Sequence, residues 1–160
     1  MTEQTTVGVR RSVTVQATPE RAFDVFTNGF NSWGPRASHH IGEKDAVAVI
    51  LEPRAGGRWF ERAEDGTECD WGFVTECEPP RRILLAWHLS PEWGFDPDPA
   101  NATEVEVTFT PTSDGTVVEL EHRGFEKHGL PGAKMRELVN QPGGWADLME
   151  MFAKEADAVG

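Results

Sequence analysis

Apolar and polar residues alternate in several short segments of the chain, the pattern of strands that bury one face. This alternation occurs at Val13 and Val15 near the N-terminus and again from Val47 to Leu51. Two further segments with the same alternation flank Asp65-Gly66. An Asp-Gly pair tolerates positive φ and suits a hairpin turn. The pattern predicts about seven strands, at residues 7–16, 47–51, 58–62, 69–78, 83–89, 103–110 and 116–124.

Two segments follow a helical period instead. Thr18-Pro19-Glu20 supplies an N-cap, a first-turn proline and an early acid, and apolar residues follow until the stop near Asn28-Gly29. Beyond position 141, apolar residues recur at steps of three and four, which predicts a helix from about Pro142 to Ala158. We expect a short helix or a loop at residues 30–42 and a short helix at residues 131–140. The apolar positions of the last helix are Trp145, Leu148, Met149, Phe152, Ala156 and Val159.

The chain has the size and composition of one globular domain. It has 160 residues, of which 38% are hydrophobic and 26% charged, values that favour a packed core over disorder. No linker or repeat interrupts the pattern, so we expect a single domain over residues 1–160. Strands followed by a strongly apolar helix predict an α+β fold, with that helix against one face of a large sheet.

The charge of the chain restricts its partners. The formal net charge is −12, which repels phosphate backbones and anionic lipid, so neither nucleic acid nor a membrane is expected to bind. The first residues, Met1 to Thr6, are polar and lack the basic start and apolar middle of a signal peptide. We therefore expect a cytoplasmic protein.

The two cysteines, Cys69 and Cys77, fall in one predicted strand. Eight residues at ~3.3 Å each separate them by ~26 Å, which is far beyond disulfide reach. They are predicted to stay reduced and unlinked.

Seven segments of the chain resemble, in order, the landmarks of the START-like (SRPBCC) superfamily. Within it they are most similar to the branch named after the C-terminal domain of the activator of Hsp90 ATPase. The resemblance implies a helix-grip fold, in which a curved antiparallel sheet surrounds a long C-terminal helix and leaves a cavity between them. The segments are Thr18–Phe23 (TPERAF), Gly56–Trp59 (GGRW), Trp71–Val74 (WGFV), Glu78–Ile83 (EPPRRI), Thr103–Phe109 (TEVEVTF), Gly115–His122 (GTVVELEH) and Gly144-Trp145.

Inward-facing aromatic and apolar residues are the candidate ligand contacts. Strand alternation places Trp71, Phe73, Thr75 and Cys77 on one face, and helical phase places the apolar residues of the last helix against the sheet. The alternative is that these side chains only fill a close-packed core. The candidates are Trp59, Trp71, Phe73, Trp87, Phe109, His122, Trp145, Leu148 and Phe152.

A few polar side chains could orient a ligand in such a cavity. His122 is in phase with Val118 and Leu120 and is predicted to point inward, either as a satisfied core residue or as an acid or base. No residue is assigned a catalytic role. The chain has no zinc spacing, phosphate loop or dinucleotide glycine pattern, so no metal or cofactor is expected. The polar candidates are His122, His88, Asp70, Glu76 and Arg58.

Three functions remain. The first is binding of a small apolar or aromatic molecule between the sheet and the C-terminal helix, without catalysis. The second is a metal-independent enzyme of the cyclase or aromatase type that uses the same cavity. The third, an Hsp90 co-chaperone, ranks last because the eukaryotic activators pair such a domain with a separate N-terminal domain for which this chain has no room. Homodimerisation is left open.

Overall fold

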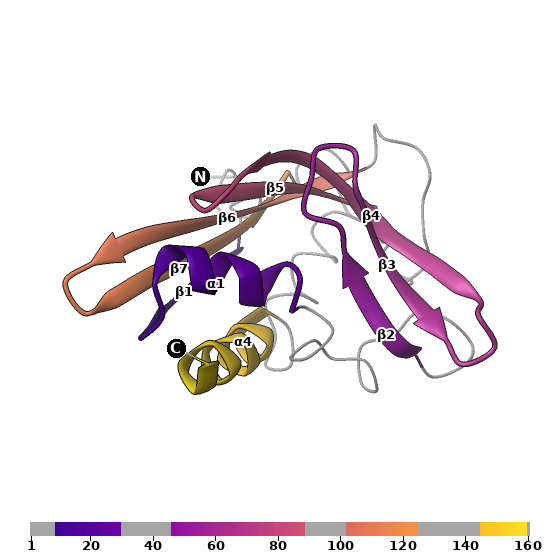
Figure 1. Cartoon of the computed structure of the whole chain (residues 1–160). Coiled ribbons are helices and arrows are strands. Elements are labelled where there is room, and N and C mark those ends of the chain that lie inside the picture. Colours follow the sequence, from indigo (N-terminus) through magenta and orange to yellow (C-terminus); the bar gives the residue numbers. More distant parts are fainter. Residues whose placement is uncertain (1–8, 30–45, 89–101, 125–144, 160) are drawn as a thin grey trace.

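The computed structural model describes residues 9–29, 46–88, 102–124 and 145–159 (Figure 1). Within them the chain forms seven strands and two helices, close to the predicted bounds. The predictions for residues 30–42 and 131–140 lie outside the described part of the chain. The elements are β1 (Val9–Val15), α1 (Pro19–Phe26), β2 (Ala46–Leu51), β3 (Arg58–Ala63), β4 (Glu68–Glu78), β5 (Arg82–Trp87), β6 (Thr103–Thr112), β7 (Gly115–Arg123) and α4 (Trp145–Val159).

The seven strands form one antiparallel sheet in the order β1-β7-β6-β5-β4-β3-β2. Strands β2 to β7 therefore follow one another as a meander, and β1 pairs with β7 at the far edge. The sheet is curled, so that β2 and β3 turn away from the half made by β1, β7 and β6 (Figure 1). This is the α+β helix-grip architecture that the resemblance implied.

Both helices lie on the same side of the sheet, where α4 contacts β1 and α1 contacts β6 and β7 (Figure 1). The Thr18 hydroxyl caps α1 by accepting a hydrogen bond from the amide of Arg21 at 3.2 Å. Phe26 of α1 meets Phe152 of α4 edge to face, with ring centroids 5.3 Å apart. Among the described helices, neither has the length and apolar character that crossing a membrane requires.

The strand register shows which side chains share a face, because residues paired directly across strands point the same way. The face toward the helices is called the inner face here, and the opposite one the outer face. Inner-face residues at the centre of the sheet are fully buried, whereas their outer neighbours are largely charged. One inner row is Leu85, Val105, His122 and Val9. The adjacent outer row is Leu84, Glu106, Glu121 and Arg10.

Strand β4 does not alternate as predicted, because two irregularities each add a residue. The register shifts opposite Trp59-Phe60 and again between Val74 and Glu76. Trp71 and Cys77 still face inward, but Phe73 pairs with Arg58 and Ala86 on the outer face. Val74, rather than Phe73 or Thr75, joins the core. The predicted inward position of Phe73 and Thr75 is therefore wrong, since a bulge interrupts the period of two.

Candidate functional site

Four aromatic side chains form a continuous row on the inner face of the sheet. The ring centroids of Trp71 and Trp59 are 5.6 Å apart, those of Trp59 and Trp87 5.7 Å, and those of Trp87 and His122 4.8 Å. Neighbouring planes are inclined by 55° to 67°, an arrangement that aromatic pairs favour over a face-to-face sandwich. We call Trp71, Trp59, Trp87 and His122 the aromatic row.

Gly72 allows the two halves of this row to meet. It lies between Trp59 on β3 and Trp87 on β5, paired directly with each. Strands two apart in a sheet are separated by ~9.5 Å, so the indoles can touch only by reaching across a position with no side chain. A Cβ on Gly72 would clash with the backbone carbonyl oxygen of Ala86, so any larger residue there would force the paired strands β4 and β5 to shift.

A buried carboxyl group stands at one end of the row. Glu61 is two residues after Trp59 on β3 and therefore shares its inner face, where it is only 3% exposed. Its Oε1 accepts a hydrogen bond from Nε1–H of Trp71 at 2.8 Å. Sequence reasoning missed Glu61, although its spacing from Trp59 within a predicted strand was the signal that could have found it.

His122 stands at the other end and is completely buried. Its Nε2 lies 2.7 Å from the hydroxyl oxygen of Thr103, which is paired with Trp87 across β5 and β6. Burial disfavours the charged imidazolium and lowers the pKa of His122 to about 3. At neutral pH the ring is therefore uncharged and can offer one nitrogen as donor and the other as acceptor. Its predicted inward orientation is confirmed.

The other predicted ligand residues are not all gathered at this row. Phe109 is six residues beyond Thr103 on β6, about 20 Å along the strand. There it contacts Phe23 and Phe26, and Phe26 contacts Phe152, so these phenylalanines belong to the core under the helices together with Leu148. The side chain of Trp145 lies outside the described residues.

Four of the five polar candidates face outward. Asp70 accepts two hydrogen bonds from the Arg58 guanidinium, at 2.6 and 3.1 Å. Glu76 accepts one from Arg82 at 2.6 Å. His88 is buried against Phe73, edge to face, on that same side. Only His122 is on the inner face, so the prediction that the others orient a ligand there is not supported by their positions.

Both cysteines are free, and both lie on inner-face positions of β4. Burial raises the pKa of both thiols, and the Glu61 and Asp70 carboxylates raise that of Cys69 further. Because the thiolate is the reactive form, we expect alkylation by iodoacetamide at neutral pH to be slower than that of free cysteine. Mass spectrometry should find two alkylation sites after unfolding in guanidinium. Rapid labelling of the folded protein would contradict this.

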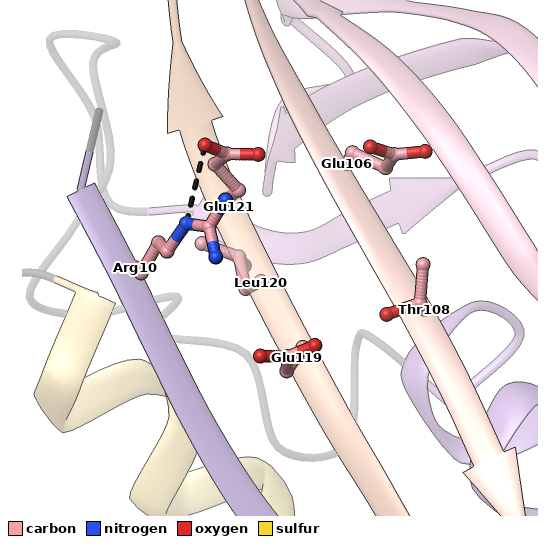
Figure 2. A pocket seen from close by; sticks show the side chains of 6 residues that line it. All are labelled: Arg10, Glu106, Thr108, Glu119, Leu120 and Glu121. Carbon is pink, nitrogen blue, oxygen red and sulfur yellow. Dashed lines mark hydrogen bonds and ion pairs between the residues drawn. The ribbon is translucent and has the colours of Figure 1, made fainter. Parts of the chain in front are cut away.

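The outer face carries a shallow hollow over β1, β6 and β7 (Figure 2). Its volume is about 200 Å³, and Arg10 reaches across it to Glu121, with 3.3 Å between Nε and Oε2. A hydrogen bond from Arg123 and, with a smaller effect, one from Arg82 hold the pKa of the Glu106 carboxyl group below its ordinary value. These groups form an ion-pair network on a solvated strand face. The lining residues are Arg10, Glu106, Thr108, Glu119, Leu120 and Glu121.

Comparison with known protein families identifies one family that matches most of the chain. The family described as Activator of Hsp90 ATPase homolog 1-like protein matches residues 16–156. A solved structure of Txn09, an anthrahydroquino-gamma-pyrone synthase complexed with SUM, is 36% identical, with a TM-score of 0.64, and the match covers 92% of this chain and 96% of that one. No curated protein matches the chain.

Two further solved structures are similar over nearly their whole length. CalC, a self-sacrificing resistance protein from Micromonospora echinospora, is 29% identical with a TM-score of 0.70, covering 98% of this chain and 97% of that one. Protein MLL2253 from Mesorhizobium loti is 20% identical with a TM-score of 0.67, covering 96% and 98% respectively. The second likeness shows a shared fold and nothing more.

Proposed function

The chain belongs to the Activator of Hsp90 ATPase homolog 1-like family, and on that premise we propose that it binds a flat aromatic small molecule at the aromatic row of its inner face. The observation that carries the proposal is the uninterrupted contact from Trp71 through Trp59 and Trp87 to His122. Each well-placed aromatic contact with a ligand contributes about 0.5–1.5 kcal/mol beyond area burial. A row of rings with polar groups at both ends matches the usual composition of a ligand pocket.

The relatives support an aromatic ligand. The name of Txn09 describes the synthesis of an anthrahydroquino-γ-pyrone, a fused polycyclic aromatic product. That protein shares 36% of its residues over nearly the whole chain. A polycycle of that kind is flat and apolar in its centre and carries oxygens at its edge. Such a molecule suits a row of indoles that has Glu61 at one end and His122 at the other.

Catalysis at the same site is the second candidate. It is favoured by two ionisable side chains on the inner face, the Glu61 carboxyl and the uncharged His122 imidazole, which lie at opposite ends of the row. Groups of these kinds transfer protons in enzymes without a metal. Turnover of a bound polycycle, followed by mass spectrometry, separates this candidate from binding alone.

Titration with anthraquinone tests the binding proposal. We expect it to raise the melting temperature, since a ligand at 100 times its Kd stabilises the folded state by about 2.7 kcal/mol. Trp59→Leu removes the ring at the centre of the row and should weaken affinity roughly fivefold, about 1 kcal/mol. Phe109→Leu is the control. It also removes an aromatic ring from the inner face, but Phe109 lies about 20 Å along β6 from Thr103 and is not part of the aromatic row.

The test compares the Kd values for anthraquinone, measured by calorimetry, of the wild-type protein, Trp59→Leu and Phe109→Leu. Equal losses of affinity in the two variants would place the ligand elsewhere. If neither anthraquinone nor a panel of other fused aromatic compounds shifts the melting curve of the wild-type protein, the binding proposal fails.

A further inference from the structure

The only Asn-Gly pair in the sequence, Asn28-Gly29, lies just beyond the C-cap of α1 at Thr27. Asparagine is a thermolabile residue, because the next amide nitrogen along the chain can attack its side-chain carboxamide. A following glycine makes this attack easiest, since it carries no side chain to hinder its own nitrogen. Asn28 is exposed, so the water that completes such a reaction reaches it.

The fold requires the glycine of this pair. A Cβ on residue 29 would stand 2.7 Å from the backbone carbonyl oxygen of Val25 and 3.1 Å from its Cα. Both are backbone atoms of α1, so no side-chain rotation would make room. Packing at the end of α1 therefore fixes the residue that makes Asn28 reactive.

Two hydrogen bonds to Asp24 hold the groups that would react. The Gly29 N–H donates to the backbone carbonyl oxygen of Asp24 at 3.0 Å. Nδ2 of Asn28 donates to the Asp24 carboxylate at 2.9 Å. The first bond must break before the Gly29 nitrogen can give up its proton, and the second restrains rotation of the carboxamide. Reaction therefore requires local opening of this turn, and helix ends open more readily than core elements.

We infer that Asn28 is a site of spontaneous deamidation and that opening of the turn after α1 sets its rate. The Gly29 nitrogen forms a bond to Cγ of Asn28, the bond from Cγ to Nδ2 breaks, and ammonia leaves with the proton from the Gly29 nitrogen. Water then hydrolyses the resulting succinimide at either carbonyl, which gives aspartate or isoaspartate. Both products place a carboxylate beside that of Asp24, at the helix end where negative charge is unfavourable.

Peptide mapping by mass spectrometry tests the site on the full chain. The folded protein and the same protein unfolded in guanidinium are incubated at the same mildly alkaline pH. In the unfolded chain Asn28 should react before the other three asparagines, none of which precedes a glycine. In the folded protein Asn28 should react at least about tenfold more slowly, the factor given by a local opening free energy of ~1.4 kcal/mol. Hydrogen exchange of the Gly29 amide should be slowed by a similar factor.

Two matched variants test the part played by Asp24. Asp24→Ala removes the carboxylate that restrains Asn28 and should speed deamidation of the folded protein about two- to fivefold. Glu20→Ala makes the same kind of change at an exposed acid in the first turn of α1 and should leave the rate unchanged. Equal rates in the two variants would overturn the inference. So would equal rates in folded and unfolded wild-type protein, or no product at Asn28 in the folded protein after prolonged incubation.

The consequence for α1 can be measured without waiting for the reaction. Asn28→Asp introduces the product's charge and should lower the melting temperature by about 2–4 °C, because like charges four residues apart and an acid at a helix C-terminus are both unfavourable. Asn28→Gln keeps an uncharged amide and is the control. An equal melting temperature of the two variants would show that deamidation does not weaken this end of α1.

Discussion

Replacing Gly72 by alanine is expected to lower the free energy of unfolding by about 3 kcal/mol, the upper end of the range for overpacked cores. The added Cβ would clash with the carbonyl oxygen of Ala86 and stand 3.0 Å from its carbonyl carbon. These are backbone atoms of the paired strand β5, so no side-chain rotation can relieve the clash. The sheet must open at the point where Trp59 and Trp87 meet.

Thermal unfolding measures this effect, and in a chain of 160 residues such a loss lowers the melting temperature by roughly 10 °C. Gly66→Ala is the control, since a Cβ there meets nothing within 4 Å and carries only the strain of φ +91°. That strain costs about 1 kcal/mol. Equal destabilisation by the two substitutions would show that the close approach of β4 and β5 at Gly72 is not a constraint.

Acidification is expected to destabilise the protein through His122. Its folded pKa, about 3, is below the ordinary value of 6.5 because burial disfavours the imidazolium. The unfolded chain therefore takes up a proton below pH 6.5 that the folded chain refuses. The contribution of His122 to stability is complete above that pH and is lost as the pH falls toward 3, by about 1.4 kcal/mol per pH unit.

Urea unfolding at pH 7 and pH 4.5 should therefore show wild-type protein losing about 2.5 kcal/mol more than His122→Gln over this interval. Carboxylates whose pKa arginines lower, such as Glu68 and Glu106, also lose stability in acid, but they do so in both proteins. Their effect cancels in the difference. Parallel losses in the two proteins would mean that His122 is not buried in its neutral form.

The sequence by itself determined the order of the elements and most of the inner face. Strict alternation runs through β5, β6 and β7, so the period of two is enough to assign Trp87, Phe109 and His122 to the correct side of the sheet. Capping residues likewise marked the start of α1 at Thr18. These signals are local, since each depends on residues a few positions apart.

Tertiary structure alone decided which of these residues meet. The bulge in β4 opposite Trp59-Phe60 turns Phe73 outward while Trp71 stays inside, and the second, between Val74 and Glu76, returns Cys77 to the inner face. No residue type marks a bulge reliably in one sequence. The register between strands, set by pairing across the whole sheet, brings Trp59 and Trp87 together over Gly72. It places Phe109 and Phe152 against Phe26, in another part of the same core. The partnership of Glu61 with Trp71 joins two strands across a bulge, so it depends on a pairing that local pattern cannot specify.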